Sequence, residues 1–278
     1  MADKVRQHSV PECYLVNWTD NNLLWVYDKL TSKTRQDIPR NVAAVKKQYD
    51  LPSAVLDLPE LSDLSVKALE DHYAQVVEPH LKATIASAVC IPNGSNISDE
   101  LHENLVSLLL MQHVRTPAYR AQIAARIRGV LREHAGSLSI GDCAYLAFLT
   151  DPGFFKVALS TLMKYSWCIG SVTGDKLLWT SDNPVHVTPV AQTYDASPGV
   201  LWTQGLSYHF PLDPQHILIL LERNHRGVLV PFEGTVVDVS TRVDEFRAQQ
   251  LTNCERVVIS MTDDFSAATI NSVPACTT

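Results

Sequence analysis

Residues 177–185 read LLWTSDNPV, an apolar run that ends abruptly in a polar turn. The side chains of residues 180–183 readily bond to nearby backbone, and the proline that follows prevents a regular continuation. The pattern predicts a strand that presents a hydroxyl, a carboxylate and an amide at its C-terminal end. Binding and catalytic groups concentrate on such turns. An Asx-type turn that closes a hairpin explains the same residues, and this stretch alone favours that simpler interpretation.

The segments on both sides of this turn are rich in β-forming residues. A Thr-Gly-Asp turn at 173–175 separates two such runs and predicts a hairpin. The elements expected in the C-terminal part are the hairpin strands 166–172 and 176–180, strands 208–212 and 216–222, a helix over 243–253 and a buried strand over 256–261.

The N-terminal part begins with a further β-rich run, LLWVY at 23–27, after the turn residues 20–22. The polar residues 31–33 predict the next turn, so a short strand pair is expected here. Apolar residues at helical spacing follow, and prolines and N-cap residues divide this region into separate helices. The expected helices are 66–90 interrupted at Pro79, one capped by Ser98 that reaches Val114, one begun by Thr116-Pro117 that runs to Gly136, 142–149, and 154–164.

This order of elements predicts an α+β fold in a single domain spanning residues 1–278. Strands occupy 1–60, helices 61–164, and mostly strands with a late helix 165–270. A mixed or antiparallel sheet is expected to combine the N-terminal and C-terminal segments around a helical middle. The chain has no repeat and no linker of the Gly/Ser/Pro type.

Composition narrows the class of protein. Of 278 residues, 46% are hydrophobic and 19% charged, as in ordinary globular proteins. The net charge of −7 gives no global attraction for nucleic acid, so an RNA partner requires a local basic stripe. No apolar run approaches the ~18 residues of a membrane span, and the N-terminus has no apolar leader. The six cysteines are scattered singly. We therefore expect a cytoplasmic protein with reduced cysteines, no membrane span and no metal site.

Motifs for nucleotide cofactors and for a serine nucleophile are missing from the sequence. It contains no G-x-G-x-x-G after a strand, no P-loop and no G-x-S-x-G. No cofactor is therefore expected.

Two glutamates stand out in the first helical stretch. Glu70 and Glu78 are eight positions apart, which brings them within about 80° of one helix face. Paired carboxylates catalyse proton transfer, bind a metal or hold a guanidinium. Two solvated charges explain the spacing equally simply, and they are the commoner case.

Arginines gather at and after the next helix junction. Arg115 lies in QHVRTP at 112–117, where it either clamps an anionic group or forms a buried ion pair. Arg120, Arg126, Arg128 and Arg132 follow, and Arg128 and Arg132 share a helix face. The stripe predicts either an RNA contact or an ordinary solvated surface.

Several weak motifs occur in an order that resembles an uncharacterised family of bacteria and fungi. The resemblance spans nearly the whole chain, although Gln7 replaces the first histidine of a family His pair and Trp18 stands where phenylalanine is usual. Its segments are His8-Ser-Val-Pro11, Tyr14-Leu15, WVYDK at 25–29, NVAA at 41–44, Tyr49, Glu70, Glu78, Gln112 to Pro117, Thr180-Ser-Asp-Asn-Pro184 and Asn253.

The chain is also similar to the fungal arginine-containing cyclodipeptide synthases. That resemblance implies an enzyme that joins an arginyl and a second aminoacyl group, both taken from charged tRNAs, into a diketopiperazine. An aminoacyl-tRNA is already activated as an ester, so the missing ATP motif is compatible with this activity. No obligate protein partner is implied.

Roles follow from chemical type within this hypothesis. A pocket would be formed by His8, Tyr14, Glu70, Arg115, Ser181 and Asp182. Ser181 would accept an acyl group or stabilise an oxyanion, and His8 or Glu70 would move protons. Tyr14 and Asp182 would orient the amine or guanidinium. Substrate binding would add Glu78, Arg115 and Asn183, and tRNA would contact Arg120, Arg128 and Arg132.

Two other functions remain open from the sequence. One is a metal-dependent nuclease or phosphodiesterase-like effector, in which Glu70, Glu78 and Asp182 hold Mg²⁺. The other is a module that binds a ligand without turnover, in which the turn at 180–184 is purely structural.

Overall fold

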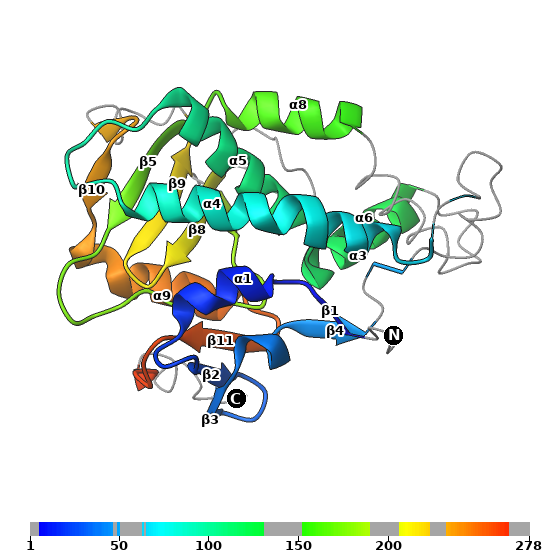
Figure 1. Ribbon diagram of the computed structural model, residues 1–278, viewed down its shortest axis with the longest axis horizontal. Coiled ribbons are helices and arrows are strands. Elements are labelled where there is room, and N and C mark those ends of the chain that lie inside the picture. Colours follow the sequence, from blue (N-terminus) through cyan, green and yellow to red (C-terminus); the bar gives the residue numbers. More distant parts are fainter. Residues whose placement is uncertain are drawn as a thin grey trace, which may run out of the picture.

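The computed structural model describes residues 6–46, 49–50, 63, 65–130, 152–189, 206–222 and 232–266. Within them the protein has the predicted α+β fold, with helices packed around two larger sheets and one small strand pair (Figure 1). The predicted helix 142–149 and the end of the helix expected to reach Gly136 lie outside the described residues.

One sheet combines the two ends of the chain, as the sequence predicted. Its order is β3 (Lys33–Asp37), β2 (Leu24–Asp28), β11 (Val257–Ser260) and β6 (Thr180–Ser181), and all pairs are antiparallel. The β2–β3 hairpin turns at the predicted polar residues, where Ser32 has a φ of 54°. Strand β11 is buried along its whole length between β2 and β6.

The second sheet comes entirely from the C-terminal half. Its order is β10 (Val236–Asp238), β5 (Ser166–Ser171), β9 (His216–Leu221), β8 (Leu206–Asp213) and β7 (His186–Pro189). Only the β10–β5 pair is parallel among the described strands, which makes the sheet mixed. Strands β5, β8 and β9 are almost wholly buried, which explains the continuous apolar run of β9.

The predicted hairpin of 166–172 with 176–180 is wrong. Strand β5 pairs with β9 and β10, whereas β6 pairs with β11 in the other sheet. The intervening turn exists, with Gly174 at a φ of 95°, but the chain then crosses between sheets. The reason is burial of the Trp179 side chain, which packs with Tyr27, Val258 and Phe265 in a second apolar cluster.

The helical middle is close to the expectation. Ser98 caps α5 (Asp99–Val114) through a bond from the Leu101 N–H, and α6 (Pro117–Val130) starts at the predicted proline. In Figure 1, α4 and α5 run across the five-stranded sheet, and α8 lies beside α5. The remaining helices and strands in this half of the molecule are α1 (Glu12–Leu15), α3 (Ala68–His72), α4 (Glu78–Val89), α8 (Pro152–Leu162), β1 (Arg6–His8) and β4 (Ala44–Lys46).

The interruption expected at Pro79 takes the form of a π-helical turn, Tyr73–Val77, between α3 and α4. Proline lacks the N–H that regular helix requires, and π-turns accommodate such a mismatch within a helix, frequently at functional sites.

The last helix, α9 (Val243–Asn253), joins the two larger sheets. It contacts β6 and β11 of the four-stranded sheet and β7 of the five-stranded sheet. This packing places the turn after β6 beside the residues that follow α9.

Among the described residues, no helix combines the length and apolar character needed to cross a membrane.

Candidate functional site

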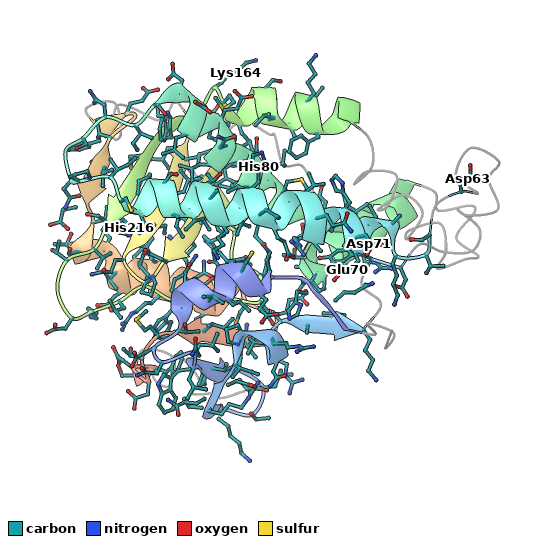
Figure 2. The ribbon with its side chains drawn as sticks, viewed as in Figure 1. Asp63, Glu70, Asp71, His80, Lys164 and His216 are labelled. Carbon is teal, nitrogen blue, oxygen red and sulfur yellow. The ribbon has the colours of Figure 1, made fainter. Side chains whose placement is uncertain are left out.

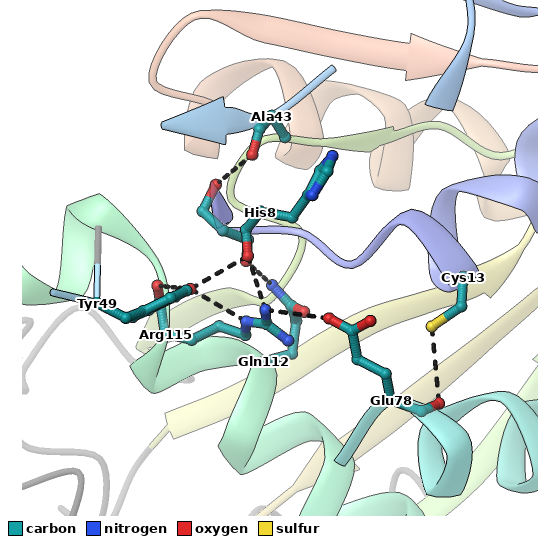
Figure 3. Close-up of polar contacts among 8 residues, drawn as sticks. His8, Cys13, Ala43, Tyr49, Glu78, Gln112 and Arg115 are labelled. Atoms are coloured by element: carbon teal, nitrogen blue, oxygen red, sulfur yellow. Dashed lines mark hydrogen bonds and ion pairs between the residues drawn. The ribbon is translucent and has the colours of Figure 1, made fainter. Parts of the chain in front are cut away.

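Arg115 lies at the centre of a buried polar cluster at the end of α5 (Figure 3). Its side chain is 1% exposed, and its guanidinium carbon lies 4.4 Å from the ring centroid of Tyr73 and 5.5 Å from that of Tyr49. Nη2 donates to the carbonyl of His8 at 2.7 Å and lies 3.5 Å from Oε1 of Glu78. The arginine therefore connects α5, β1 and the start of α4.

A second set of bonds fixes the backbone at β1. The amide of Gln112 donates to the Ser9 carbonyl at 3.0 Å, and the Tyr49 hydroxyl donates to the Arg115 carbonyl at 2.9 Å. Nε of Arg115 in turn donates to the Tyr49 hydroxyl at 3.1 Å. Because both carbonyls of the His8–Ser9 segment are bonded to side chains, this segment is held rigidly.

The two glutamates noted in the sequence both face this cluster. The charges of Glu70 and Glu78 each raise the pKa of the Tyr49 phenol, after burial as the larger cause. Glu70 lies on α3, which precedes the π-helical turn (Figure 2). The Glu78 side chain remains 25% exposed, so it is the carboxylate of the Arg115 pair that a ligand can reach.

His8 has the properties of a proton acceptor. Its Nε2 lies 3.1 Å from the carbonyl of Arg40, so this nitrogen carries the proton and donates it. Nδ1 makes no hydrogen bond with the part of the chain that the structure describes. Burial lowers the pKa of His8, although the Arg40 bond and the charges of Glu12 and Glu78 oppose this effect. The imidazole is therefore neutral near pH 7, with Nδ1 able to take up a proton.

Cys13 lies close to the same groups but is a poor nucleophile. Its thiol donates to the backbone carbonyl of Glu78 at 3.7 Å. Burial, followed by the charge of Glu78, raises the pKa of the Cys13 thiol to about 11. Since the thiolate is the reactive form, Cys13 is protonated and unreactive at neutral pH.

The polar turn after β6 has partners within the protein for most of its groups. The Tyr14 hydroxyl donates to the Pro211 carbonyl at 2.7 Å and lies 2.7 Å from the Thr180 hydroxyl. The Ser181 hydroxyl donates to Oε1 of Gln250 at 2.8 Å, and the Asn183 amide donates to the Asn253 carbonyl at 3.1 Å. Tyr14 and Ser181 are fully buried. Their contacts connect β6 to β8 and α9.

Asp182 accepts backbone bonds from the segment that follows α9. Oδ1 accepts the N–H of Glu255 at 2.9 Å, and Oδ2 accepts those of Arg256 at 2.9 Å and Val257 at 3.1 Å. Burial raises the pKa of Asp182, and the three backbone donors counteract that rise. The carboxylate thus fixes the N-terminal end of β11 beside β6.

Replacing Asp182 with alanine is expected to lower the free energy of unfolding by about 2–3 kcal/mol, because backbone donors lose a charged acceptor. Asp175→Ala changes an exposed carboxylate in a nearby turn and is expected to change stability by less than about 0.5 kcal/mol. Urea denaturation of both variants measures the difference. Equal stabilities would show that the Asp182 bonds contribute nothing to the fold.

A pocket of ≈ 380 Å³ is lined by residues of both ends of the chain. Ser9 and the backbone that leads into β4 contribute to its lining, together with Asp182 and the segment after α9. The lining residues are Ser9, Asp28, Arg35, Asn41, Val42, Ala43, Ala44, Val45, Pro117, Asp182, Glu255, Arg256 and Val257. Its volume falls within the range of small-molecule sites.

The residues singled out in the sequence thus fall into separate groups. The first, around the guanidinium of Arg115, contains His8, Glu70, Glu78 and Arg115. The second, at the turn after β6, contains Tyr14, Ser181 and Asn183. Of all these residues, Asp182 alone lines the described pocket.

The arginines expected to contact tRNA are placed only in part. Arg120 is half-buried on α6. The side chain of Arg128 and the whole of Arg132 lie outside the described part of the chain.

The metal-site alternative required Glu70, Glu78 and Asp182 to share one ion. In the structure, Glu78 pairs with Arg115, whereas Asp182 accepts the N–H groups of 255–257. These two carboxylates are thus committed to different partners.

Four residues of the site received no role from sequence reasoning: Tyr49, Gln112, Glu255 and Arg256. Gln112 and Arg115 are three positions apart at the end of one helix, a spacing that puts both on one face and was a usable signal. Glu255 and Arg256 follow α9 without any local pattern. They line the same pocket as Ser9 only because β11 packs between β2 and β6.

Comparison with known proteins identifies the family but no characterised relative. No curated protein and no solved structure matches the chain. The family model described as "Protein of unknown function (DUF4238)" matches residues 6–264, which include both groups of site residues and the pocket. The chain therefore belongs to the DUF4238 family.

Proposed function

We propose that the protein is a cytoplasmic, aminoacyl-tRNA-dependent cyclodipeptide synthase that makes arginine-containing diketopiperazines. The observation that carries the proposal is the state of His8, a neutral imidazole on a rigid backbone whose Nδ1 is able to accept a proton. Acyl transfer to an amine requires such a base. The choice of substrate is supported by the order of sequence motifs that resembles the fungal arginine-containing cyclodipeptide synthases.

The reaction proceeds in two balanced steps. The α-amine of one aminoacyl-tRNA attacks the ester carbonyl of the other, a C–N bond forms, and the ester C–O bond breaks. His8 takes the proton from the attacking amine and returns it to the ribose oxygen that leaves. The free amine of the dipeptidyl ester then attacks the second ester in the same way. Two uncharged tRNAs and one six-membered ring result, without ATP or a cofactor.

Glu78 supports the proton transfer electrostatically. Its carboxylate raises the pKa of His8 and is partly exposed beside it. A carboxylate near the ring stabilises the imidazolium that forms while the amine is attacking. Arg115 acts as a positioning residue, because it bonds both to the His8 carbonyl and to Glu78.

The tRNA is proposed to contact α6 and the arginine that follows it in the sequence. The protein carries a net charge of −7, so recognition of a polyanion requires a local basic surface. Helix α6 contains Arg120, Arg126 and Arg128, and Arg132 follows it in the sequence.

The proposal is tested by expressing the protein in a bacterial host and analysing extracts by mass spectrometry. We expect new cyclic dipeptides that contain arginine, and the purified protein should form them from charged tRNAs in the presence of EDTA. Folded protein that gives no such product would overturn the proposal. Nuclease activity that EDTA abolishes and Mg²⁺ restores would instead favour a metal-dependent phosphodiesterase.

A further inference from the structure

We infer that the pocket between Ser9 and Val257 holds the guanidinium of the arginyl substrate, and that Glu255 is the carboxylate that binds it. This inference rests on the proposed function and adds the specificity-determining residue.

With one exception, each charged side chain that lines the pocket is bonded to an oppositely charged side chain or to backbone N–H groups. Nε of Arg256 donates to Asp28 at 2.9 Å, and Nε of Arg35 donates to Asp37 at 3.3 Å. The carboxylate of Asp182 accepts the three backbone N–H groups of residues 255–257. Both arginines lining the pocket thus already have acidic partners.

Glu255 is the exception. Its carboxylate forms no ion pair within the described residues, and the side chain is exposed at the pocket wall. Burial and the charge of Asp182 raise the pKa of Glu255, so the protein itself stabilises its negative charge poorly. A cation bound in the pocket offsets both effects, because it pairs with Glu255 and lies near Asp182.

The part of the lining formed by Ser9 and Ala43 is rigid. Ala43 has a φ of 51°, a left-handed conformation that is unusual for alanine, and its carbonyl accepts both the N–H and the hydroxyl of Ser9 at 3.0 Å. Backbone strain of this kind persists where the surroundings enforce it, and it clusters at binding sites. A pocket that combines a rigid backbone lining with a carboxylate suits a planar cation such as guanidinium.

The position of the pocket also agrees with the proposed reaction. Ser9 lines the pocket and directly follows His8, whose backbone is bonded to Arg115. A substrate whose side chain enters the pocket is therefore anchored beside the segment that carries the proposed base.

The test measures binding without turnover. L-arginine methyl ester and its neutral isostere L-citrulline methyl ester are titrated into wild-type protein and into Glu255→Gln by calorimetry. We expect the wild type to prefer the arginine ester by about tenfold, and the variant to lose this preference, because it keeps the shape but not the charge. The matched control is Glu103→Gln on α5, an exposed glutamate remote in sequence from every residue that lines the pocket.

Three outcomes decide the inference. A preference for the arginine ester that survives in Glu255→Gln would overturn it, even if cyclodipeptides are formed. A preference that Glu103→Gln also loses would overturn it as well. Loss of the preference for the arginine ester in Glu255→Gln alone supports the guanidinium site, whether or not cyclodipeptides are formed. A failure of the proposed reaction is recognised separately, by mass spectrometry of the products.

Discussion

Replacing His8 with glutamine is expected to lower the rate of cyclodipeptide formation by about 10²–10³-fold, because the reaction loses its general base. The amide nitrogen of glutamine takes the place of Nε2 and can still donate to the Arg40 carbonyl. The fold is therefore preserved while the proton acceptor at Nδ1 is removed. Product is quantified by mass spectrometry with purified protein and charged tRNAs.

The matched control is His80→Gln, since His80 is an exposed histidine on α4 (Figure 2). Its rate should equal that of the wild type. The pH profile separates a base from a structural residue. Burial lowers the pKa of His8 below 6.5, so wild-type activity should be constant above that pH and fall only in more acidic solution. A wild-type rate in His8→Gln would remove His8 from the mechanism.

Replacing Arg115 with methionine is expected to lower the free energy of unfolding by about 3 kcal/mol, because the change breaks a buried ion pair and leaves polar partners without a donor. The groups left without this donor are the His8 carbonyl, the Tyr49 hydroxyl and the Glu78 carboxylate. The measurement is guanidinium chloride denaturation followed by circular dichroism.

Arg115→Lys should recover only part of this loss. Lysine has a single ammonium and cannot reproduce the planar group that contacts the rings of Tyr49 and Tyr73. Arg40→Met provides the comparison, since the Arg40 side chain is exposed and only its carbonyl bonds to His8. Should Arg115→Met be as stable as Arg40→Met, the buried cluster would not be a structural anchor.

Local chemistry explains why much of the fold was predictable. Ser98 and Thr116 each cap the helix that follows them, and a cap depends on residues within one helical turn. The β2–β3 hairpin is equally local, since its strands are neighbours in the sequence. The pairing of N-terminal with C-terminal strands followed from composition, because both ends of the chain are rich in β-forming residues around a helical middle.

The candidate site was less predictable because its bonds join distant segments. The donors to Asp182 come from residues more than 70 positions later, and Arg115 bonds to a carbonyl 107 positions earlier. From the sequence, Asp182 was expected to bind a cationic group of the substrate, because a carboxylate in a polar turn can pair with a cation. The structure gives it three backbone N–H groups instead, and it transfers the cation-binding role in our proposal to Glu255.

The turn at 180–184 illustrates the difference between what local sequence determines and what only tertiary packing decides. The sequence alone determined that a strand ends there, because proline and short polar residues act within a few positions. Of the expected bonds to nearby backbone, the structure shows the Asn183 N–H donating to Ser181 Oγ, whereas Asp182 and Asn183 bond to backbone about 70 positions away. Only the tertiary structure decided that this strand joins β11 and not β5, and that Tyr14 and Ser181 are buried. Those outcomes depend on which distant apolar surfaces are buried together, and here Trp179 with Tyr27 and Phe265 draws the strand into the sheet of the N-terminal segments.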